Sequence, residues 1–494
     1  MPLSLMEIFE NCNTSTLAPY VPSAEKPWNI ERIHHLYRRL GFSASVPTIN
    51  AGISRNPGEL VDEIIDEAIN LPITTAPEWA DWTGINYPQE NDLRNELLNT
   101  QRREWALTYA EAILNDALRD RLSFFWSNHF VTELNVYNLP TFCIQYTHSL
   151  QTHSLGNFKE FVREIGITNA MLRYLDGNRN RKNRPNENYA RELFELFSLG
   201  EGNGYTEEDI VETSRALTGY VRTVIPEDYF SGFMFEPTQF DTGTKTVFGQ
   251  TGAWGYDDII EILFTERQNE IATFICEKLY KYFVHPDAPE AIINEMAATF
   301  IAANWEIAPV LRQLFKSEHF FDSNSIGVII KSPYDVIFDF INETSFQYDQ
   351  QILESVIYFN GLIGQNLFNP VDVAGWQRNR NWISANALIG RWSIMEWFIF
   401  YNWNIDQEQF RTFAIDLAGD STDPYYITRE IVDAVVPRGL LTDDDYQIAS
   451  DIFKSDIPDF YYEDNTWNLY WESAPYQVLL LLLHVVKEPE FQLK

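Results

Sequence analysis

Hydrophobic positions along the chain recur mainly with the period of an α-helix. In the segment IERIHHLYRRLGF, apolar side chains are spaced three, four and seven residues apart, which places them on one face of a helix. They are Ile33, Leu36, Tyr37 and Leu40, and Gly41 follows them where a helix commonly ends. The pattern therefore predicts an amphipathic helix that begins near residue 30.

Similar patterns predict that helix dominates the rest of the chain. One helix is well marked, because Thr206 is a favoured N-cap residue and acidic side chains fill the turn that follows it. The apolar run from Val478 to Val486 is about half as long as a membrane-spanning helix and is predicted to be a buried C-terminal helix. The other predicted helical ranges are 58–70, 92–135, 156–174, 186–199, 257–321, 333–359 and 385–401.

Residues 222–251 break this pattern. Aromatic and β-branched residues are mixed there with Gly and Pro, which favours a short β-hairpin or an ordered loop, and we expect this stretch to form a lid. The predicted fold is mainly α, a large multi-helix globular assembly with this one insertion. We expect an irregular lead-in over residues 1–28, a main helical domain over 29–400, and a helical region over 401–494 packed on that domain.

Composition narrows the classes of function. The chain has 71 Asp and Glu against 36 Lys and Arg, and its formal charge of −35 repels polyanions, so nucleic acid is not an expected partner. The three cysteines, Cys12, Cys143 and Cys276, have no metal-binding or disulfide spacing. No secretory signal or transmembrane segment can be read, so a cytoplasmic location is the default expectation and export alongside a partner is the alternative.

Four blocks of the sequence form a distinctive set. They are HLYRRLGFSAS from His35, RLSFFWSNHFVT from Arg121, the run HSLGNFKEFVREIGITNAMLRYLDGNRNRKNRPNENYARELFELFSLG from His153, and YTEEDIVETSRALTGY from Tyr205. These blocks resemble the family catalogued as domain of unknown function 1800. With weaker similarities further along, the resemblance covers residues from about 30 to 395.

The resemblance implies a helical fold and no settled activity. Genes of this family often neighbour those of a second, apparently secreted family, which implies a secreted or cell-envelope-associated protein as partner. The chain departs from the family at two positions, because Phe197 and Phe240 stand where many members have His. If those histidines bind metal in other members, this chain has lost ligands, and a histidine-centred metal site is less expected here.

The segment DGNRNRKNRPNE has the oxygen donors of a calcium-binding loop. Asp176, Asn178 and Asn180 occupy its first, third and fifth positions, and Glu187 occupies the twelfth. Arg181 stands at the sixth position, where such loops need Gly for a sharp turn. The alternative interpretation is that these side chains cap and turn the chain between two helices.

The helix predicted after this loop carries a second candidate site. Asn188, Glu192 and Glu195 are spaced four and three residues apart and so share one helix face, as helix-borne catalytic or metal-binding carboxylates do. Arg191 suggests a simpler role for the group. Its pairing with Glu187 or Glu195 would make these residues a structural ion-pair network.

Three further candidates lie elsewhere along the chain. His129, among aromatic residues in FFWSNHF, is expected to be held in one orientation, as a general base, a ligand or a satisfied core residue. Asp241 and Lys245 would present a charge pair to a ligand or form an exposed hairpin tip. Trp376 and Arg378 would stack on a sugar or peptide ring, or hold a loop through cation-π contacts.

These observations leave three hypotheses for the function. The first is a partner or scaffold component that acts with a secreted or cell-envelope-associated protein. The second is an enzyme that uses His129, Glu187, Arg191, Glu192 and Glu195 for acid-base chemistry or to hold a divalent cation such as calcium. The third is a carbohydrate- or peptide-binding module. The sequence lacks GxGxxG, P-loop, HExxH and GxSxG motifs, which disfavours common nucleotide enzymes, zinc proteases and serine hydrolases.

Overall fold

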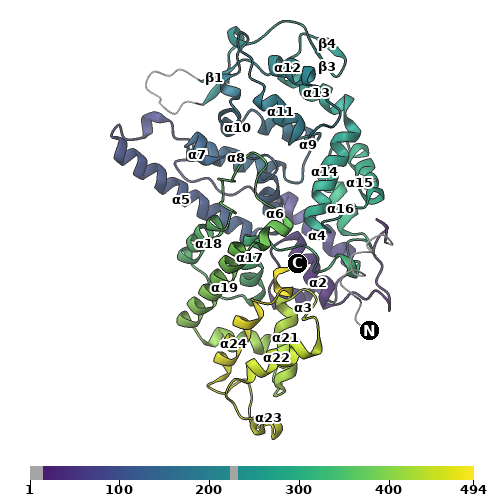
Figure 1. The fold of residues 1–494 in the computed structure, drawn as a ribbon, viewed down its shortest axis with the longest axis vertical. Coiled ribbons are helices and arrows are strands. Elements are labelled where there is room, and N and C mark those ends of the chain that lie inside the picture. Colours follow the sequence, from purple (N-terminus) through teal and green to yellow (C-terminus); the bar gives the residue numbers. More distant parts are fainter. Residues whose placement is uncertain (1–14, 223–231) are drawn as a thin grey trace.

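The structure is a computed structural model in which residues 15–222 and 232–494 are described. This part of the chain contains 23 α-helices and two two-stranded antiparallel sheets (Figure 1). The predicted mainly α fold with a short hairpin insertion is therefore confirmed. The molecule is elongated, with the hairpins at one end and the last helices of the chain at the other (Figure 1).

The first half of the chain builds the middle of the molecule and the end that carries the hairpins (Figure 1). Its helices are α2 (Ile30–Leu40), α3 (Val46–Gly52), α4 (Pro57–Asn70), α5 (Asn91–Asn115), α6 (Ala117–Ser127), α7 (Leu134–Tyr137), α8 (Pro140–His153), α9 (Phe158–Ile165), α10 (Asn169–Tyr174), α11 (Asn188–Glu195) and α12 (Glu207–Ala216).

The second half begins with helices that pack along one side of this body and continues into the opposite end (Figure 1). These helices are α13 (Tyr256–Glu266), α14 (Gln268–Phe283), α15 (Glu290–Ala302), α16 (Ile307–Phe315), α17 (Pro333–Thr344), α18 (Gln350–Leu362), α19 (Ala385–Ile405), α20 (Glu408–Ala418), α21 (Pro424–Val435), α22 (Asp443–Lys454), α23 (Phe460–Glu463) and α24 (Ala474–Val485).

Helix α2 agrees with its prediction. The Asn29 side chain accepts a hydrogen bond from the backbone N–H of Arg32 and so caps the N-terminus, and Gly41 follows the last helical residue. The helix also buries Arg38, whose guanidinium binds the Glu343 carboxylate at 2.6 Å. This contact joins the first helix to α17, some 300 residues further along the chain.

The predicted helical range 92–135 is divided into three helices. Helix α5 ends at Asn115 and α6 begins at Ala117, whose φ of 43° takes the chain out of the right-handed helix. The side-chain amide of Asn342 donates a hydrogen bond to the Leu114 carbonyl at 3.2 Å, which satisfies an acceptor at the end of α5. Periodicity missed this break because neither Gly nor Pro marks it in the sequence.

The insertion after α12 consists of two hairpins. Strand β1 (Tyr220–Arg222) pairs with β2 (Phe233–Phe235), and β3 (Lys245–Val247) pairs with β4 (Gln250–Gly252). The α12 helix that precedes them begins at the Thr206 N-cap, as the sequence predicts, and this cap is part of a capping box with Asp209. Residues 223–231, a central part of the expected lid, lie outside the described residues.

The apolar run near the end of the chain forms α24, and its prediction as a buried helix is confirmed. Val478, Leu481 and Leu482 are fully buried there. None of the helices that the structure describes is long and apolar enough to cross a membrane. The expected boundary at residue 400 falls inside α19, against which α24 packs, so the two regions are joined by a continuous helix.

Candidate functional site

The predicted calcium loop is held by contacts with protein groups. The Asp176 carboxylate pairs with Arg179 at 3.1 Å. The buried Asn180 accepts a hydrogen bond from the Asn186 backbone N–H at 2.9 Å and donates one to a backbone carbonyl of α12 at 2.8 Å, whereas the buried Asn178 Oδ1 makes none within the described chain. These contacts favour the turn interpretation. The structure groups no three His, Cys, Asp or Glu side chains around a metal position within residues 15–222 and 232–494, and the calcium site stays a prediction.

The carboxylates of α11 surround one arginine. Arg191 pairs with Glu187 at 3.4 Å, with Glu195 at 3.1 Å and with Glu207 of α12 at 2.7 Å. Several of these side chains are exposed, so each pair contributes little on its own. The arrangement favours the interpretation as an ion-pair network that ties α11 to α12.

Among the described residues, Asn188, Glu192 and His129 form no hydrogen bond or ion pair with Arg191 or its carboxylate partners. Asn188 is exposed at the start of α11. Burial, and then the charge of Glu195, raise the pKa of Glu192. His129 makes its hydrogen bonds with Phe197 and with a lysine of α14, so none of its described contacts joins it to these carboxylates.

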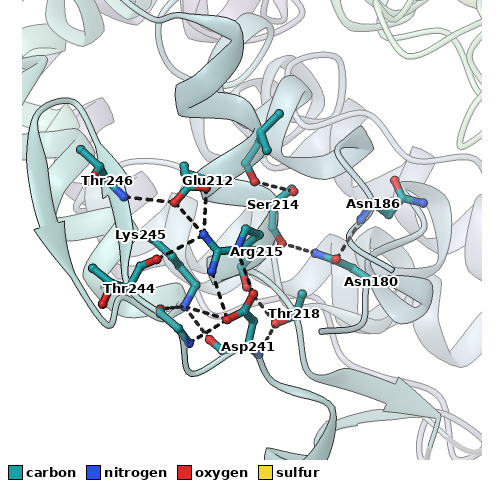
Figure 2. A network of polar contacts seen from close by, with 12 residues as sticks. Asn180, Asn186, Glu212, Ser214, Arg215, Thr218, Asp241, Thr244, Lys245 and Thr246 are labelled. Atoms are coloured by element: carbon teal, nitrogen blue, oxygen red, sulfur yellow. Dashed lines mark hydrogen bonds and ion pairs between the residues drawn. The ribbon is translucent and has the colours of Figure 1, made fainter. Parts of the chain in front are cut away.

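Asp241 and Lys245 belong to an internal cluster that fastens the β3–β4 hairpin to α12 (Figure 2). Arg215 lies at its centre and binds the Asp241 carboxylate at 2.9 Å and the Glu212 carboxylate at 2.9 Å. The fully buried Lys245 side chain donates hydrogen bonds to the Asp241 and Gly243 carbonyls at 2.5 and 3.0 Å. Both predicted residues therefore use their polar atoms within the protein.

A pocket of 380 Å³ gathers other candidates. It lies between the end of α6, α14, the start of α17 and the segment 376–382. Its volume falls in the range of about 300–1,000 Å³ that is usual for small-molecule sites. Its aromatic and polar lining includes Lys278, Tyr282, Asp335, Trp376, Arg378 and Trp382.

The segment with Trp376 and Arg378 is attached to the C-terminal end of α6. The Asn128 side-chain oxygen accepts a hydrogen bond from the Trp376 backbone N–H at 2.5 Å, and the Asn128 carbonyl accepts one from Arg378 at 3.3 Å. Gly375 permits this approach, because its φ is 89° and a Cβ there would lie 2.2 Å from Asn128 Oδ1. The Trp376 indole donates a hydrogen bond to the Asn366 carbonyl at 3.0 Å, which fixes the ring as a wall of the pocket.

Lys278 of α14 is held by two hydrogen-bond acceptors. Its Nζ lies 3.0 Å from Nδ1 of His129 and 3.0 Å from the Leu196 carbonyl. Nε2 of His129 lies 3.1 Å from the Phe197 carbonyl, which can only accept, so the partners assign the imidazole hydrogen to Nε2 and leave Nδ1 as an acceptor. Burial holds the pKa of His129 well below its usual value, so the ring is neutral.

The pocket is rich in basic groups although the whole chain is strongly acidic. Lys281 pairs with a glutamate one turn earlier on α14, and Lys494 pairs with Asp335 at 2.7 Å. Lys278 and Arg378 have no carboxylate partner within the described part of the chain. Two basic side chains therefore remain beside the pocket for a ligand.

Asp335, which lines the pocket, belongs to a buried network of ion pairs. Asp335 binds Arg121 at 2.5 Å as well as Lys494. Burial opposes ionisation of Asp335, but these cations outweigh it and hold its pKa well below the usual range. Asp339 and Glu343 follow at intervals of four residues on α17, and both are buried. Such a network fixes the position of each of its members.

A larger hollow of 620 Å³ lies between α2, α3, α4 and the junction of α5 with α6. Its charged lining includes Arg55 and Glu63, which pair with each other. None of the side chains proposed from the sequence lines it. The smaller pocket is the better candidate, because a fixed indole converges there with basic groups that have no carboxylate partner in residues 15–222 and 232–494.

The sequence profile of a family described as protein of unknown function (DUF1800) matches residues 35–493. The chain belongs to this family. The resemblance drawn from the four sequence blocks is therefore confirmed. No curated protein and no solved structure matches the chain. The pocket of this DUF1800 member is accordingly interpreted from its own geometry.

Sequence reasoning identified some residues of the DUF1800 pocket and missed others. Trp376 and Arg378 were found through their composition. His129 was found through its aromatic surroundings, and it does not line the pocket but contacts Lys278, which does. Lys278 was missed because it lies in an ordinary helix beside other charged residues. Asp335 was also missed. The sequence feature that could have identified it is its place in a series of acidic residues, spaced four apart, in a strongly apolar helix.

Proposed function

We propose that this protein binds a small organic anion with an apolar ring in the pocket lined by Lys278, Trp376 and Arg378. The observation that carries the proposal is the convergence, beside a fixed indole, of two basic side chains that have no carboxylate partner among the described residues. An anionic group would pair with the charged Arg378 guanidinium beside Lys278, and the aromatic walls would bury the ring.

A carboxylate or phosphate is favoured as the anionic group. The planar guanidinium of Arg378 has five N–H donors, and the structure describes one hydrogen bond from it, to the Asn128 carbonyl. Hydrogen bonds between ionised groups are roughly twice as strong as those between neutral groups. Binding of an anion therefore makes better use of Arg378 than binding of a neutral sugar.

Calorimetric titration with p-toluate, a benzoate that carries a methyl group, tests this proposal. We expect one saturable site, and uncharged p-methylbenzyl alcohol should bind at least about tenfold more weakly, a difference of about 1.4 kcal/mol. Arg378→Gln should weaken p-toluate binding by about the same factor, because it removes the charge and keeps an amide.

Arg380 provides the matched control. It is an exposed arginine two residues further along the same segment, and it does not line the pocket. Arg380→Gln should leave p-toluate binding unchanged. Equal losses in the two variants, or equal affinities for the acid and the alcohol, would rule the pocket out as a selective anion site.

Family membership supports a second proposal. We propose that the protein acts together with a secreted or cell-envelope-associated protein that is encoded nearby. Tyr358 and Leu362, one turn apart on α18, are 63% and 66% exposed, and exposed apolar side chains of this kind support a protein contact. The double replacement by Ser should reduce stoichiometric co-purification with the purified product of the neighbouring gene. Replacement of Leu93, an exposed apolar residue of α5, is the control. If the double replacement leaves capture of the partner unchanged, this surface is not the contact site.

A further inference from the structure

We infer that Lys278 is a nucleophile that forms an imine with a carbonyl-bearing organic anion in this pocket. The inference rests on the proposed function, because the anionic group would hold the carbonyl carbon close to the amine. The class of substrate is an aldehyde or ketone that also carries a carboxylate or phosphate. Lysine amines that lie in desolvated pockets or beside another cation form such covalent intermediates.

The hydrogen bonds of Nζ leave its lone pair available. A neutral amine has two N–H groups and one lone pair. The Leu196 carbonyl and His129 Nδ1 are both acceptors and both lie 3.0 Å from Nζ, so they take the two N–H groups. No other hydrogen bond to Nζ is found in the part of the chain that the structure describes. The centroid of the Phe274 ring lies 4.2 Å from Nζ, a contact that takes no hydrogen bond from a neutral amine. The remaining tetrahedral position therefore carries no hydrogen bond, and its lone pair is the one that would attack a carbonyl carbon.

The charges around Lys278 favour the neutral amine. Burial, and then the charge of Arg378, lower the pKa of Lys278 well below its usual value. His129, which faces Nζ from the turn that follows α6, is itself neutral and adds no opposing charge. The other charged groups of the pocket are already paired, Glu277 with Lys281 and Asp335 with Lys494.

The reaction balances without an oxidant or a reductant. The Nζ lone pair forms a bond to the carbonyl carbon while the π electrons of the carbonyl group move to its oxygen. The first Nζ proton passes to this alkoxide, and the second leaves with the oxygen as water when the C–O bond breaks and the C=N bond forms. His129 is a positioning residue in this scheme, since it holds the amine through Nδ1 and touches no substrate atom.

Reductive trapping in the intact protein tests the inference. The protein is incubated near neutral pH with m-formylbenzoate or p-formylbenzoate and sodium cyanoborohydride, and peptide mass spectrometry maps the modified lysines. Lys278 should be modified at least about tenfold faster than Lys281, because each pH unit by which the pKa of an amine falls raises its neutral fraction about tenfold. Lys281 is a matched internal reference, one turn further along α14 and paired with Glu277.

Two further measurements define the outcome. Excess p-toluate, which has no aldehyde or ketone group, should slow the modification of Lys278 and not that of Lys487, which pairs with Glu396 and does not line the pocket. Lys278→Arg should abolish the preferred modification. If p-toluate binds but Lys278 reacts no faster than Lys281, the imine inference is overturned and the proposed anion binding stands. If neither binding nor preferred modification is found, both are overturned.

Discussion

Nζ of Lys278 and Nδ1 of His129 lie 3.0 Å apart, and they join α14 to the C-terminal end of α6. The other imidazole nitrogen donates a hydrogen bond to the Phe197 carbonyl, so the ring presents an acceptor to the lysine and cannot rotate without losing both bonds. His129 is 2% exposed. Its effect on a ligand would therefore act through Lys278.

The first prediction concerns this contact. His129→Leu removes the Nδ1 acceptor and should slow the modification of Lys278 by formylbenzoate about tenfold, the effect of losing one positioning hydrogen bond. His129→Asn, whose side-chain oxygen can replace Nδ1, should recover most of the rate. Binding of p-toluate, measured by calorimetry, should change much less than the rate in both variants. A wild-type rate in His129→Leu would mean that the histidine is a packing residue alone.

The second prediction concerns the approach of Gly375 to Asn128. Gly375→Ala places a Cβ 2.2 Å from Asn128 Oδ1 at a φ of 89°, so the segment with Trp376 and Arg378 must shift. We expect p-toluate affinity to fall at least about tenfold, in addition to a loss of about 1–2 kcal/mol in folding stability from the left-handed backbone. Gly249→Ala is the control, since its φ is 81° and a Cβ there meets no atom within 4 Å. It should lose stability without losing affinity.

Sequence reasoning succeeded where local patterns decide the structure. The cap at Thr206 and the buried run from Val478 follow from propensity and periodicity, and both are present. The break at Ala117 was missed, because its stabilising contact comes from Asn342 of a distant helix. Local signals do not report such contacts.

The candidate site was harder to predict than the fold, for the same reason. Trp376 and Arg378 could be singled out by composition, but their place in a pocket depends on the contact of Gly375 with the end of α6. The lowered pKa of Lys278 follows from burial, and the position of its amine follows from the contact with His129. Neither can be read from the residues around Lys278 in the sequence. Sequence patterns indicate side-chain types, whereas the pairing of charges is decided by tertiary packing.

The third prediction separates the two interpretations of the loop at Asp176. Asn180→Ala leaves one buried and one partly buried backbone group without a partner and should lower the free energy of unfolding by about 1–3 kcal/mol, with or without a chelator. Asn178→Ala removes a buried oxygen that has no partner among the described residues and should cost little. Denaturant unfolding of both variants, with calcium and with a chelator, is the measurement. A calcium-dependent loss in both would support a metal site instead.

The fourth prediction uses the pH dependence of folding. Burial, against the opposing charge of Lys331, raises the pKa of Asp339 from 3.8 to about 7. The folded state therefore binds this proton more tightly than the unfolded state, and the contribution of Asp339 to stability is largest at acid pH and is lost as pH rises through about 7. Relative to Asp339→Asn, the wild type should lose up to roughly 4 kcal/mol of stability between pH about 4 and 7.

Asp241, which lies in the separate cluster around Arg215, supplies the control for this measurement. Burial opposes ionisation of Asp241, but the hydrogen bond with Arg215 outweighs it and lowers the pKa, so the contribution of Asp241 is complete above pH about 4 and is lost only as pH falls further. The stability difference between wild type and Asp241→Asn should therefore stay flat between pH about 4 and 7. Denaturant unfolding at several pH values measures both differences. Two flat profiles would be inconsistent with a protonated Asp339 in the core.

A crystal structure of the protein grown with p-toluate tests the anion-binding claim most directly. The account predicts that the carboxylate lies within hydrogen-bonding distance of the Arg378 guanidinium and that the ring packs against the Trp376 indole. Binding of p-toluate at another surface, with the pocket between α6, α14 and α17 left empty, would contradict it.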